Sequence, residues 1–346
     1  NVLGFKERKG SDLVSMKDIA QACGVSVATV SKALNGQPDI GEETRVRVCE
    51  MAQKMGYTVN SAARALKINR TYHLGVLFVD EKRSGLGHEY FSTVLESFKT
   101  ESERHGYDIT FINHNVGGKP TSYLQHCRYR GVDGVAIACV DFLDPRVREL
   151  AESELPLVTL DHVFNNRLAV VSDNVQGVEA LVRYAYQMGH RRIAFLHGET
   201  TTVTQNRLVG FYRACEELGL EIPEEYVREA AYHDPDRCAA TTMELMQLPE
   251  RPTCILFPDD YSYVGGQNAL AQMGLQIPED VSVAGFDGIP LGEYYIPKLS
   301  TMRQPVEAMA DKTVRLLLQI LEEGGSHEHL IFPAELVIRE STAPPG

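Results

Sequence analysis

The spacing of apolar residues near the start of the chain predicts a short helix over residues 16–23. Its apolar residues recur every three or four positions, as on one face of a helix. They are Met16, Ile19, Ala20 and Cys23. Ser15 can cap this helix, with Asp18 closing a capping box. Gly24 can take the positive φ that a tight turn requires, so the chain can turn into a second helix.

The second helix is predicted from Val27 to Leu34, with Ser26 as its N-cap and Asn35-Gly36 at its end. Its inward positions are Val25, Val30 and Leu34, and its outward positions are Val27, Ala28, Thr29, Ser31 and Lys32. Two short helices joined by a glycine turn are typical of a helix-turn-helix, whose second helix lies in the DNA major groove. The alternative is a helical hairpin in an all-α cap that touches no DNA.

The outward side chains of the second helix suit contact with DNA. Small residues allow a close approach to base edges. Thr29 and Ser31 can donate to phosphate oxygens, and Lys32 can reach O6 and N7 of guanine.

A third helix is predicted from Glu42 to Met55, with Gly41 at its N-cap, which completes a helical domain over residues 15–58. A short helix follows from Ala62 to Lys67, within a hinge and linker over residues 59–71. Leu66 is its one large apolar side chain, and a plain linker helix is the alternative to a functional one.

From His73 onward, strand-like apolar runs alternate with helical patterns. The runs cover residues 74–79, 108–113, 134–139, 155–160, 169–172, 192–197, 253–258 and 281–286. Such alternation predicts parallel sheets covered by helices, and eight strands exceed what one small domain needs. We therefore expect an α/β body of two doubly wound parallel-sheet subdomains, with ligands bound beyond the carboxyl ends of the strands.

Charge is distributed unevenly along the 346 residues, whose net charge is −13. Residues 1–70 hold 11 basic and 7 acidic side chains, against 23 and 40 in the remainder. A basic head on an acidic body is typical of a protein that offers only its N-terminus to DNA. The seven cysteines lack metal-like spacing, and no signal peptide or membrane-length apolar run occurs, which predicts reduced core thiols and a cytoplasmic protein.

Several motifs resemble those of the LacI/GalR family of transcriptional regulators, to which the lactose and purine repressors belong. The head carries "DIAQACGVSVATVSKALNG", the hinge "NSAARALK", and the body "GVDGVAI", "MGHRRIAFLHG", "RLVGF", "PTCILFPDD", "GLQIPEDVSVAGFD" and "PKLSTMRQP". The resemblance covers residues 15–341. It implies a helix-turn-helix head, a hinge helix and a body like a periplasmic binding protein, with two subdomains joined by three crossovers around an effector cleft.

Carried over position by position, the resemblance implies base contacts from Val27, Ala28 and Lys32. It implies phosphate contacts from Thr29, Ser31, Asn35, Thr44 and Asn60. Ser26, the helix cap, completes the predicted DNA-binding set together with Leu66, which would wedge into the minor groove at the operator centre. Val59 and Gly41 depart from the proline and serine that the family usually has there.

The resemblance also implies an effector site. Its predicted residues are Tyr90, Phe91, Asp161, Arg207, Tyr232, Asp259 and Asp287. Three acids, one arginine and aromatic faces favour a neutral polyhydroxylated ligand, hence a sugar, with a purine corepressor as the alternative. The alternative to effector contact is a structural role for these residues. Arg207 and Asp287 could form a salt bridge that closes the subdomains, and Asp260 could cap a helix.

No catalytic residue, cofactor or metal site is expected. An enzyme of this size would need a phosphate loop or dinucleotide fingerprint that the sequence lacks, and "HEH" at 327–329 is a poor chelate. A sugar-transport protein would lack the DNA-binding head. We expect a homodimer on a pseudo-palindromic operator, not a tetramer, since Pro344-Pro345 forbid a C-terminal heptad helix.

The predicted domain boundaries follow these assignments. Residues 1–14 form an arm and residues 342–346 a tail. The first subdomain takes residues 72–172 and 304–331, and the second takes residues 173–303 and 332–341.

Overall fold

The computed structural model describes residues 14–57, 70–79, 87–324 and 329–346. Its contacts divide the chain into two units, residues 1–71 and residues 72–346. Asn60 and Leu66 of the predicted DNA-binding set, Val59 and most of the predicted hinge lie outside the described residues.

Within residues 14–57, the N-terminal unit contains three helices, α1 (Met16–Cys23), α2 (Val27–Leu34) and α3 (Glu42–Lys54). Its core is Ile19, Ala20, Val30, Ala33, Val48 and Ala52, with Val14, Met16, Cys23, Val25 and Leu34 among the partly buried side chains around it. Ser15 and Asp18 form the predicted capping box of α1, and Gly24 turns the chain with φ of 66°. Val14, assigned above to the arm, packs against this core because its side chain is apolar.

The body contains two six-stranded sheets. The first has the strand order β13-β7-β6-β5-β1-β2, and all its pairings are parallel. Its strands are β1 (His73–Phe78), β2 (Asp108–Phe111), β5 (Gly134–Ala138), β6 (Leu157–Leu160), β7 (Leu168–Ser172) and β13 (His329–Phe332). A separate short hairpin joins β3 (Asn115–Val116) to β4 (Lys119–Pro120).

The second sheet has the order β14-β12-β11-β10-β8-β9, and only β14 is antiparallel to its neighbour. Its strands are β8 (Ile193–His197), β9 (Val227–Glu229), β10 (Cys254–Leu256), β11 (Ser282–Asp287), β12 (Ser300–Arg303) and β14 (Glu335–Val337). The chain therefore crosses between the sheets three times, after β7, after β12 and after β13.

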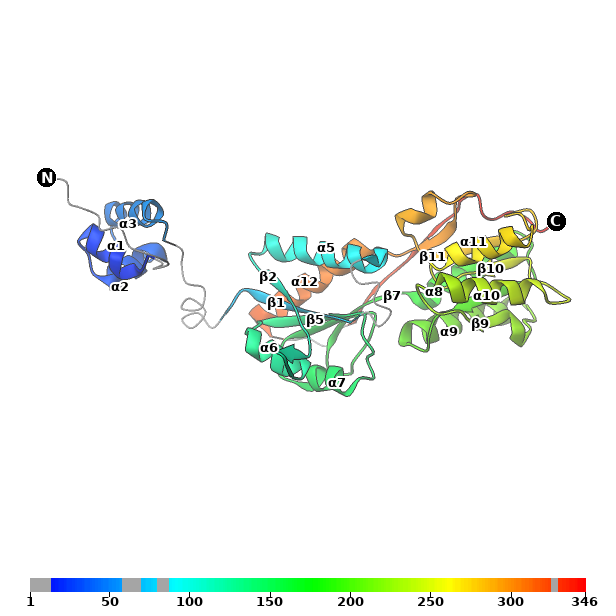
Figure 1. Ribbon diagram of the computed structural model, residues 1–346, viewed down its shortest axis with the longest axis horizontal. Helices are drawn as coiled ribbons and strands as arrows, with labels where there is room; N and C mark the ends of the chain where they lie inside the picture. The colour runs from blue at the N-terminus through cyan, green and yellow to red at the C-terminus, as the bar shows by residue number, and fades with distance from the viewer. Residues whose placement is uncertain (1–13, 58–69, 80–86, 325–328) are drawn as a thin grey trace. The chain divides into compact units, whose positions relative to one another are not determined.

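Helices cover both faces of each sheet. The helices α5 (Glu89–Arg104) and α12 (Val306–Glu323) cover one face of the first sheet, and α6 (Tyr123–Arg130) and α7 (Pro145–Glu152) the other (Figure 1). In the second sheet, α8 (Asn174–Gln187) and α9 (Thr202–Glu217) face one core, and α10 (Pro235–Met246) and α11 (Tyr263–Gln272) the other. Successive strand residues alternate between the two cores, so the predicted doubly wound α/β architecture is confirmed.

The last residues, predicted as a tail, are hydrogen-bonded to the second subdomain. The Ala343 amide donates to Ser282 Oγ over 3.0 Å, and the Ala343 carbonyl accepts from the His190 ring over 2.9 Å. The expected boundary before residue 332 is also one residue early, because Phe332 pairs with Ser172 in the first sheet. These hydrogen bonds hold a chain end that has no regular pattern of its own.

Two further findings concern the described residues alone. No helix there is long and apolar enough to cross a membrane. Four of the seven free cysteines are buried as expected, but Cys49 is exposed and Cys139 lies in the cavity described below.

Candidate functional site: a cavity between two sheets and a reading helix

A cavity of about 420 Å³ lies at the carboxyl ends of both sheets. In the first sheet it is lined by Val79 and Cys139, which follow β1 and β5. In the second it is lined by Glu199 and Asp259, which follow β8 and β10. Each pair of strands is where the order of its sheet reverses, the position at which such sheets bind ligands. The cavity therefore belongs to both subdomains.

All seven predicted effector residues line this one cavity. They are Tyr90, Phe91 and Asp161 from the first subdomain, and Arg207, Tyr232, Asp259 and Asp287 from the second. Tyr90 is 6% exposed, so it is a buried part of the cavity wall.

Arg207 on α9 is the centre of a buried polar network. Its side chain is 4% exposed. Nε donates to Asn174 Oδ1 over 2.7 Å, and Nη1 donates to the Pro258 carbonyl over 2.8 Å. The guanidinium carbon lies 3.6 Å from the centre of the Phe286 ring, a cation–π contact. These partners fix the direction in which the guanidinium points.

Asp287, at the end of β11, faces Arg207 with its Oδ1 3.6 Å from Nη2. The same oxygen accepts from Gln304 Nε2 over 2.7 Å, and Gln304 begins the second crossover. Burial raises the pKa of the Asp287 carboxyl to about 6, against the lowering effect of Arg207. Both residues belong to the second subdomain, so their ion pair does not close the cleft, and that reading is wrong.

Asp161 links two strands and a helix of the first subdomain, namely β6, β7 and α5. It follows β6 with φ of 59°, its Oδ1 accepts from the Ser172 amide over 3.1 Å, and its Oδ2 accepts from the Tyr90 hydroxyl over 3.0 Å. Burial raises the pKa of this carboxyl as well. A ligand hydroxyl that approached Asp161 would compete with the Tyr90 hydroxyl for the same oxygen.

The carboxylates of Asp259 and Asp260 are occupied by the protein. Asp259 accepts from the Ser262 amide and hydroxyl, each over 2.7 Å, and from the His233 amide over 2.9 Å. Asp260, fully buried, accepts from Thr301 over 2.6 Å and from the Ile289 amide over 3.0 Å. Asp260 thus links the ends of separate strands and does not cap a helix as expected. Asp259 instead binds the turn that leads into α11.

Tyr232 lies against the chain at Gly198, where any Cβ would overlap its ring. Its hydroxyl is 3.0 Å from Thr204 Oγ1, and its amide donates to Glu199 over 3.0 Å. The ring therefore has a fixed position beside Arg207, whose guanidinium carbon is 5.5 Å from its centre.

Several lining residues were missed from the sequence. His88 of the first subdomain stacks on His233 of the second with ring centres 4.0 Å apart, and His233 stacks on Tyr261 at 3.9 Å. Asn174, Glu199, Phe142 and Gln304 also line the cavity. Proximity to a strand end was the available signal, but the stacking depends on how the subdomains meet.

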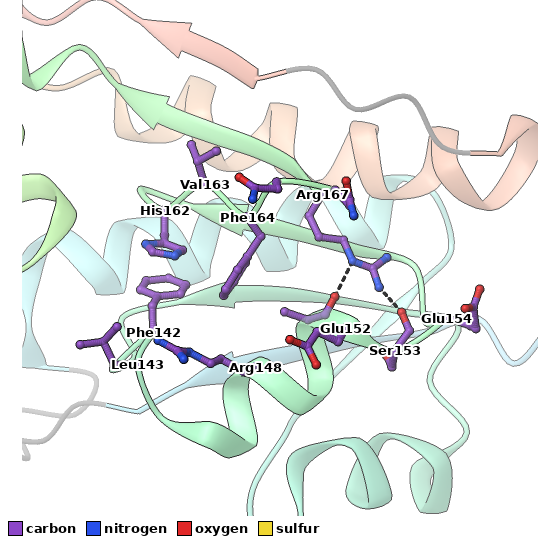
Figure 2. Close-up of a pocket in the computed structure, with 13 residues that line it drawn as sticks. Phe142, Leu143, Arg148, Glu152, Ser153, Glu154, His162, Val163, Phe164 and Arg167 are labelled. Atoms are coloured by element: carbon purple, nitrogen blue, oxygen red, sulfur yellow. Dashed lines mark hydrogen bonds between the residues drawn. The ribbon is translucent and has the colours of Figure 1, made fainter.

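A second cavity, of about 740 Å³, lies within the first subdomain between α7 and the loop after β6. Phe142 and His162 line both cavities. Their rings stack with centres 4.0 Å apart, and Phe164 stands edge-on to His162 (Figure 2). His162 Nδ1 is 3.1 Å from Thr202 Oγ1 on α9, so this wall also joins the two subdomains.

The second cavity differs from the first in its polar groups. Arg167 crosses one end and donates to the carbonyls of Ala151 and Ser153 (Figure 2). It also donates to the Leu155 carbonyl. The effector cavity, in contrast, is lined by carboxylates of both subdomains, among them Asp161 of the first and Asp259 and Asp287 of the second. Among the described residues, no group of three or more His, Cys, Asp or Glu is arranged to hold a metal ion.

In the head, the predicted DNA-binding residues that the structure describes lie on α2 and next to it. Ser26 caps the helix by accepting from the Thr29 amide over 3.0 Å. Val27 is 45% exposed, Ala28 and Lys32 are exposed, and Thr29, Ser31 and Thr44 are half-buried. Asn35 ends the helix and donates to the Ser31 carbonyl over 2.6 Å.

Two family profiles match the chain. The family described as bacterial regulatory proteins, lacI family, matches residues 15–60, and the periplasmic binding protein-like domain matches residues 182–342.

Curated relatives align over nearly the whole length. The HTH-type transcriptional repressor PurR of Vibrio parahaemolyticus is 30% identical over 339 residues, covering 95% of this chain and 98% of the relative. The probable HTH-type transcriptional repressor ExuR of Bacillus subtilis is 29% identical over 333 residues, covering 95% and 98%.

Solved structures share the fold. The lac repressor dimer bound to operator and the anti-inducer ONPF has a TM-score of 0.82 at 23% identity, covering 96% of this chain and 100% of that one. The complex of the transcriptional regulator CelR with cellobiose has a TM-score of 0.69 at 23% identity, covering 95% and 99%.

Proposed function

The chain belongs to the lacI family of bacterial regulatory proteins, and we propose that it represses transcription until a neutral sugar occupies the cavity between its subdomains. The observation that carries this proposal is the meeting of all seven predicted effector residues at one cavity shared by two sheets. A ligand there touches both subdomains, so it can favour one angle between them.

The charges of the cavity support a neutral ligand. Its lining holds the carboxylates of Asp141, Asp161, Glu199, Asp259 and Asp287. The lining also holds the guanidinium of Arg207, but this group is already engaged with the protein groups Asn174, Pro258 and Asp287. A phosphate or carboxylate on the ligand would face these acids, whereas sugar hydroxyls can donate to them. Aromatic faces such as Tyr232 can pack on the C–H surface of a sugar ring.

The head supports a DNA-binding role. We propose that Val27, Ala28 and Lys32 contact bases, and that Ser26, Thr29, Ser31, Asn35 and Thr44 hold the helix against phosphates, with Asn60 and Leu66 acting in the hinge. One such head covers a half-site, so the working form is a homodimer on a pseudo-palindromic operator. This work takes place on chromosomal DNA in the bacterial cytoplasm, and the chain has no catalytic role.

In this proposal, sugar binding is coupled to operator binding through the crossovers between the subdomains. Asn174 follows the first crossover and holds Arg207, and Gln304 begins the second and holds Asp287. A sugar that repositions Arg207 or Asp287 acts directly on these segments. The resulting rotation of the first subdomain changes the spacing of the two hinges of the dimer and lowers operator affinity by about 1–3 kcal/mol, the usual range of allosteric coupling.

The test begins with selection of binding sites from a random duplex library by the full chain. The selected duplex is then titrated by fluorescence anisotropy with neutral sugars, their phosphates, uronates and purines. A neutral sugar is expected to lower the affinity about 5- to 150-fold. A purine that raises the affinity would instead establish corepression, the alternative reading, and failure to enrich any sequence would remove the DNA-binding role.

A further inference from the structure

The proposed base reader Lys32 does not stand free in the head. Its ammonium pairs with the carboxylate of Asp39, and the side chains are 50% and 53% exposed. The turn after α2 brings the acid there, since the Gln37 amide donates to the Lys32 carbonyl over 3.0 Å and the Gly36 amide to the Ala33 carbonyl over 3.2 Å. Asp39 thus lies beside the last turn of the reading helix.

Stability does not account for this pair. Exposed ion pairs contribute little to folding, and a carboxylate is disfavoured near the C-terminal end of a helix. The Lys32 ammonium lowers the pKa of the Asp39 carboxyl, so the acid keeps its charge at working pH. A negative charge held beside a helix that approaches DNA also opposes the phosphates.

The basic and acidic side chains of the folded head are equal in number, so the charge of Asp39 affects its attraction to DNA. Residues 14–57 hold five basic and five acidic side chains: Lys17, Lys32, Arg45, Arg47 and Lys54 against Asp18, Asp39, Glu42, Glu43 and Glu50. The excess of positive charge in residues 1–70 therefore comes from outside the described head. Arg45 is paired with Glu42 within α3, just as Lys32 is paired with Asp39. The folded head has little net attraction for DNA of arbitrary sequence.

We infer that Asp39 is a specificity-determining residue that competes with DNA for the Lys32 ammonium. On a random sequence, Lys32 finds only diffuse negative charge and stays with Asp39. At the operator, O6 and N7 of a guanine offer two directed acceptors that draw Lys32 away from the acid. Because the pair has to be broken at the operator but not on a random sequence, Asp39 lowers operator affinity more than nonspecific affinity. This inference rests on the proposed role of Lys32 as a base reader.

The competition has a measurable signature in salt. Each cation that neutralises a phosphate adds about 0.9 to the slope of log affinity against log salt. While Lys32 stays paired with Asp39, that contribution is missing from nonspecific binding. Release of Lys32 by Asp39→Asn should therefore steepen the nonspecific slope by about one. It should raise operator affinity about fivefold, because no ion pair then has to be broken there, with a smaller gain in nonspecific affinity.

The experiment measures anisotropy of labelled duplexes with the full chain over a series of salt concentrations. The duplexes are a mixed-sequence duplex and the operator selected from the random library. The proteins are the unmodified chain, Asp39→Asn, Lys32→Ala and the double variant, with Glu50→Gln as an equal change of charge elsewhere on the head. Circular dichroism melting checks that every head remains folded.

Two results support the inference. Asp39→Asn increases the ratio of operator to nonspecific affinity, and this increase disappears when Lys32 is already alanine. Glu50→Gln leaves the ratio unchanged. The inference is overturned if Asp39→Asn raises both affinities equally, with the same factor in the Lys32→Ala background, because the acid would then act by simple repulsion.

The role of Lys32 is tested separately. An unchanged sequence preference in Lys32→Ala, with operator binding retained, would show that Lys32 is no base reader and would overturn the competition with it. The proposed repressor function would survive that result.

Discussion

Lys32 and Arg207 are both proposed to contact a ligand, but their surroundings differ. Lys32 is half exposed, and its partner Asp39 lies seven positions away along the chain. Arg207 is 4% exposed, and its partners Asn174, Pro258 and Asp287 come from separate segments of the second subdomain. One cation is held by a turn, the other by the fold of a subdomain.

This difference decides what a substitution measures. An exposed pair can be removed at little cost in stability, so a change in DNA binding reports on recognition. Removal of one member of a buried network leaves its partners buried without a hydrogen-bond or ion-pair partner. A loss of effector response then cannot be separated from a loss of folding. Experiments on the cavity therefore need a readout of folding beside the readout of function.

The largest expected effect is on stability, from Arg207→Ala. This change removes the hydrogen bonds to Asn174 and Pro258 and leaves the Asp287 carboxyl buried without its counterion. The free energy of unfolding should fall by about 3–5 kcal/mol. Calorimetry of the full chain measures the loss.

Arg213→Ala on the same helix is the matched control, because Arg213 is 59% exposed in its pairs with Glu179 and Glu217. It should cost at most about 1 kcal/mol. Equal losses in the two variants would contradict a buried network around Arg207.

The next effect is a pH dependence from Asp287. Its pKa rises from 3.8 in the ordinary case to about 6 in the folded protein. The charged form is therefore less favoured in the folded protein than in the unfolded chain. Stability from this group is highest below pH of about 4 and is lost as the pH rises to about 6, by up to about 3 kcal/mol.

Asp287→Asn cannot make this transition, so its melting temperature should fall less than that of the unmodified chain between those pH values. Asp236→Asn, at an exposed position in the first turn of α10, should keep the full fall. Melting curves that run parallel with pH for all three proteins would show that Asp287 titrates as in an unfolded chain.

A smaller effect is expected on ligand selection, from Phe142→Ala. The Phe142 ring and His162 separate the effector cavity from the second cavity. Loss of the ring should let longer saccharides release the operator, and stability should fall by about 1 kcal/mol through the lost ring pair. Titration with saccharides of increasing length measures the change.

Leu143→Ala is the control for that wall, since Leu143 is 67% exposed and, of the two cavities, lines the second. Its length preference should equal that of the unmodified chain. A Phe142→Ala variant with the same length preference would contradict the assignment of the ring as a limit on ligand size.

Local patterns carried most of what the sequence predicted. The caps at Ser15 and Ser26 and the glycine turn depend on neighbours within four positions, so spacing alone locates them. The effector residues were implied by the family resemblance. Asp161, Asp259 and Asp287 among them also lie at or after strand ends, and the carboxyl ends of parallel strands meet at one edge. A carboxylate after a strand looks the same whether it binds a ligand or the backbone, so the internal role of Asp259 did not follow from its position.

Contacts that depend on packing between segments escaped the sequence. The pair of Lys32 with Asp39 requires the turn to fold back on α2, and no periodicity specifies that turn. The stack of His88 on His233 requires two subdomains to meet at one angle. The position of Phe142 beside His162 depends on two loops, whose residues carry no repeating pattern.

The smallest effect is expected in the head, from Ser26→Ala. Ser26 Oγ accepts from the Thr29 amide over 3.0 Å, and loss of such a cap costs about 1 kcal/mol. Because the head and body are separate units, the loss should stay within the head. Hydrogen exchange of the full chain should show amide protection in the head falling about fivefold, with the strands of the body unchanged.

Ser31→Ala on the same helix is the control, because the bond that Asn35 makes there uses the Ser31 backbone carbonyl and survives the change. Its amides should keep their protection, while both variants lose a proposed phosphate contact and bind DNA more weakly. Equal protection in Ser26→Ala and Ser31→Ala would show that Ser26 acts at the DNA alone. Faster exchange in the body of Ser26→Ala would show that a local loss of stability in the head also destabilises the body. The contrast between Lys32 and Arg207 would then be one of degree.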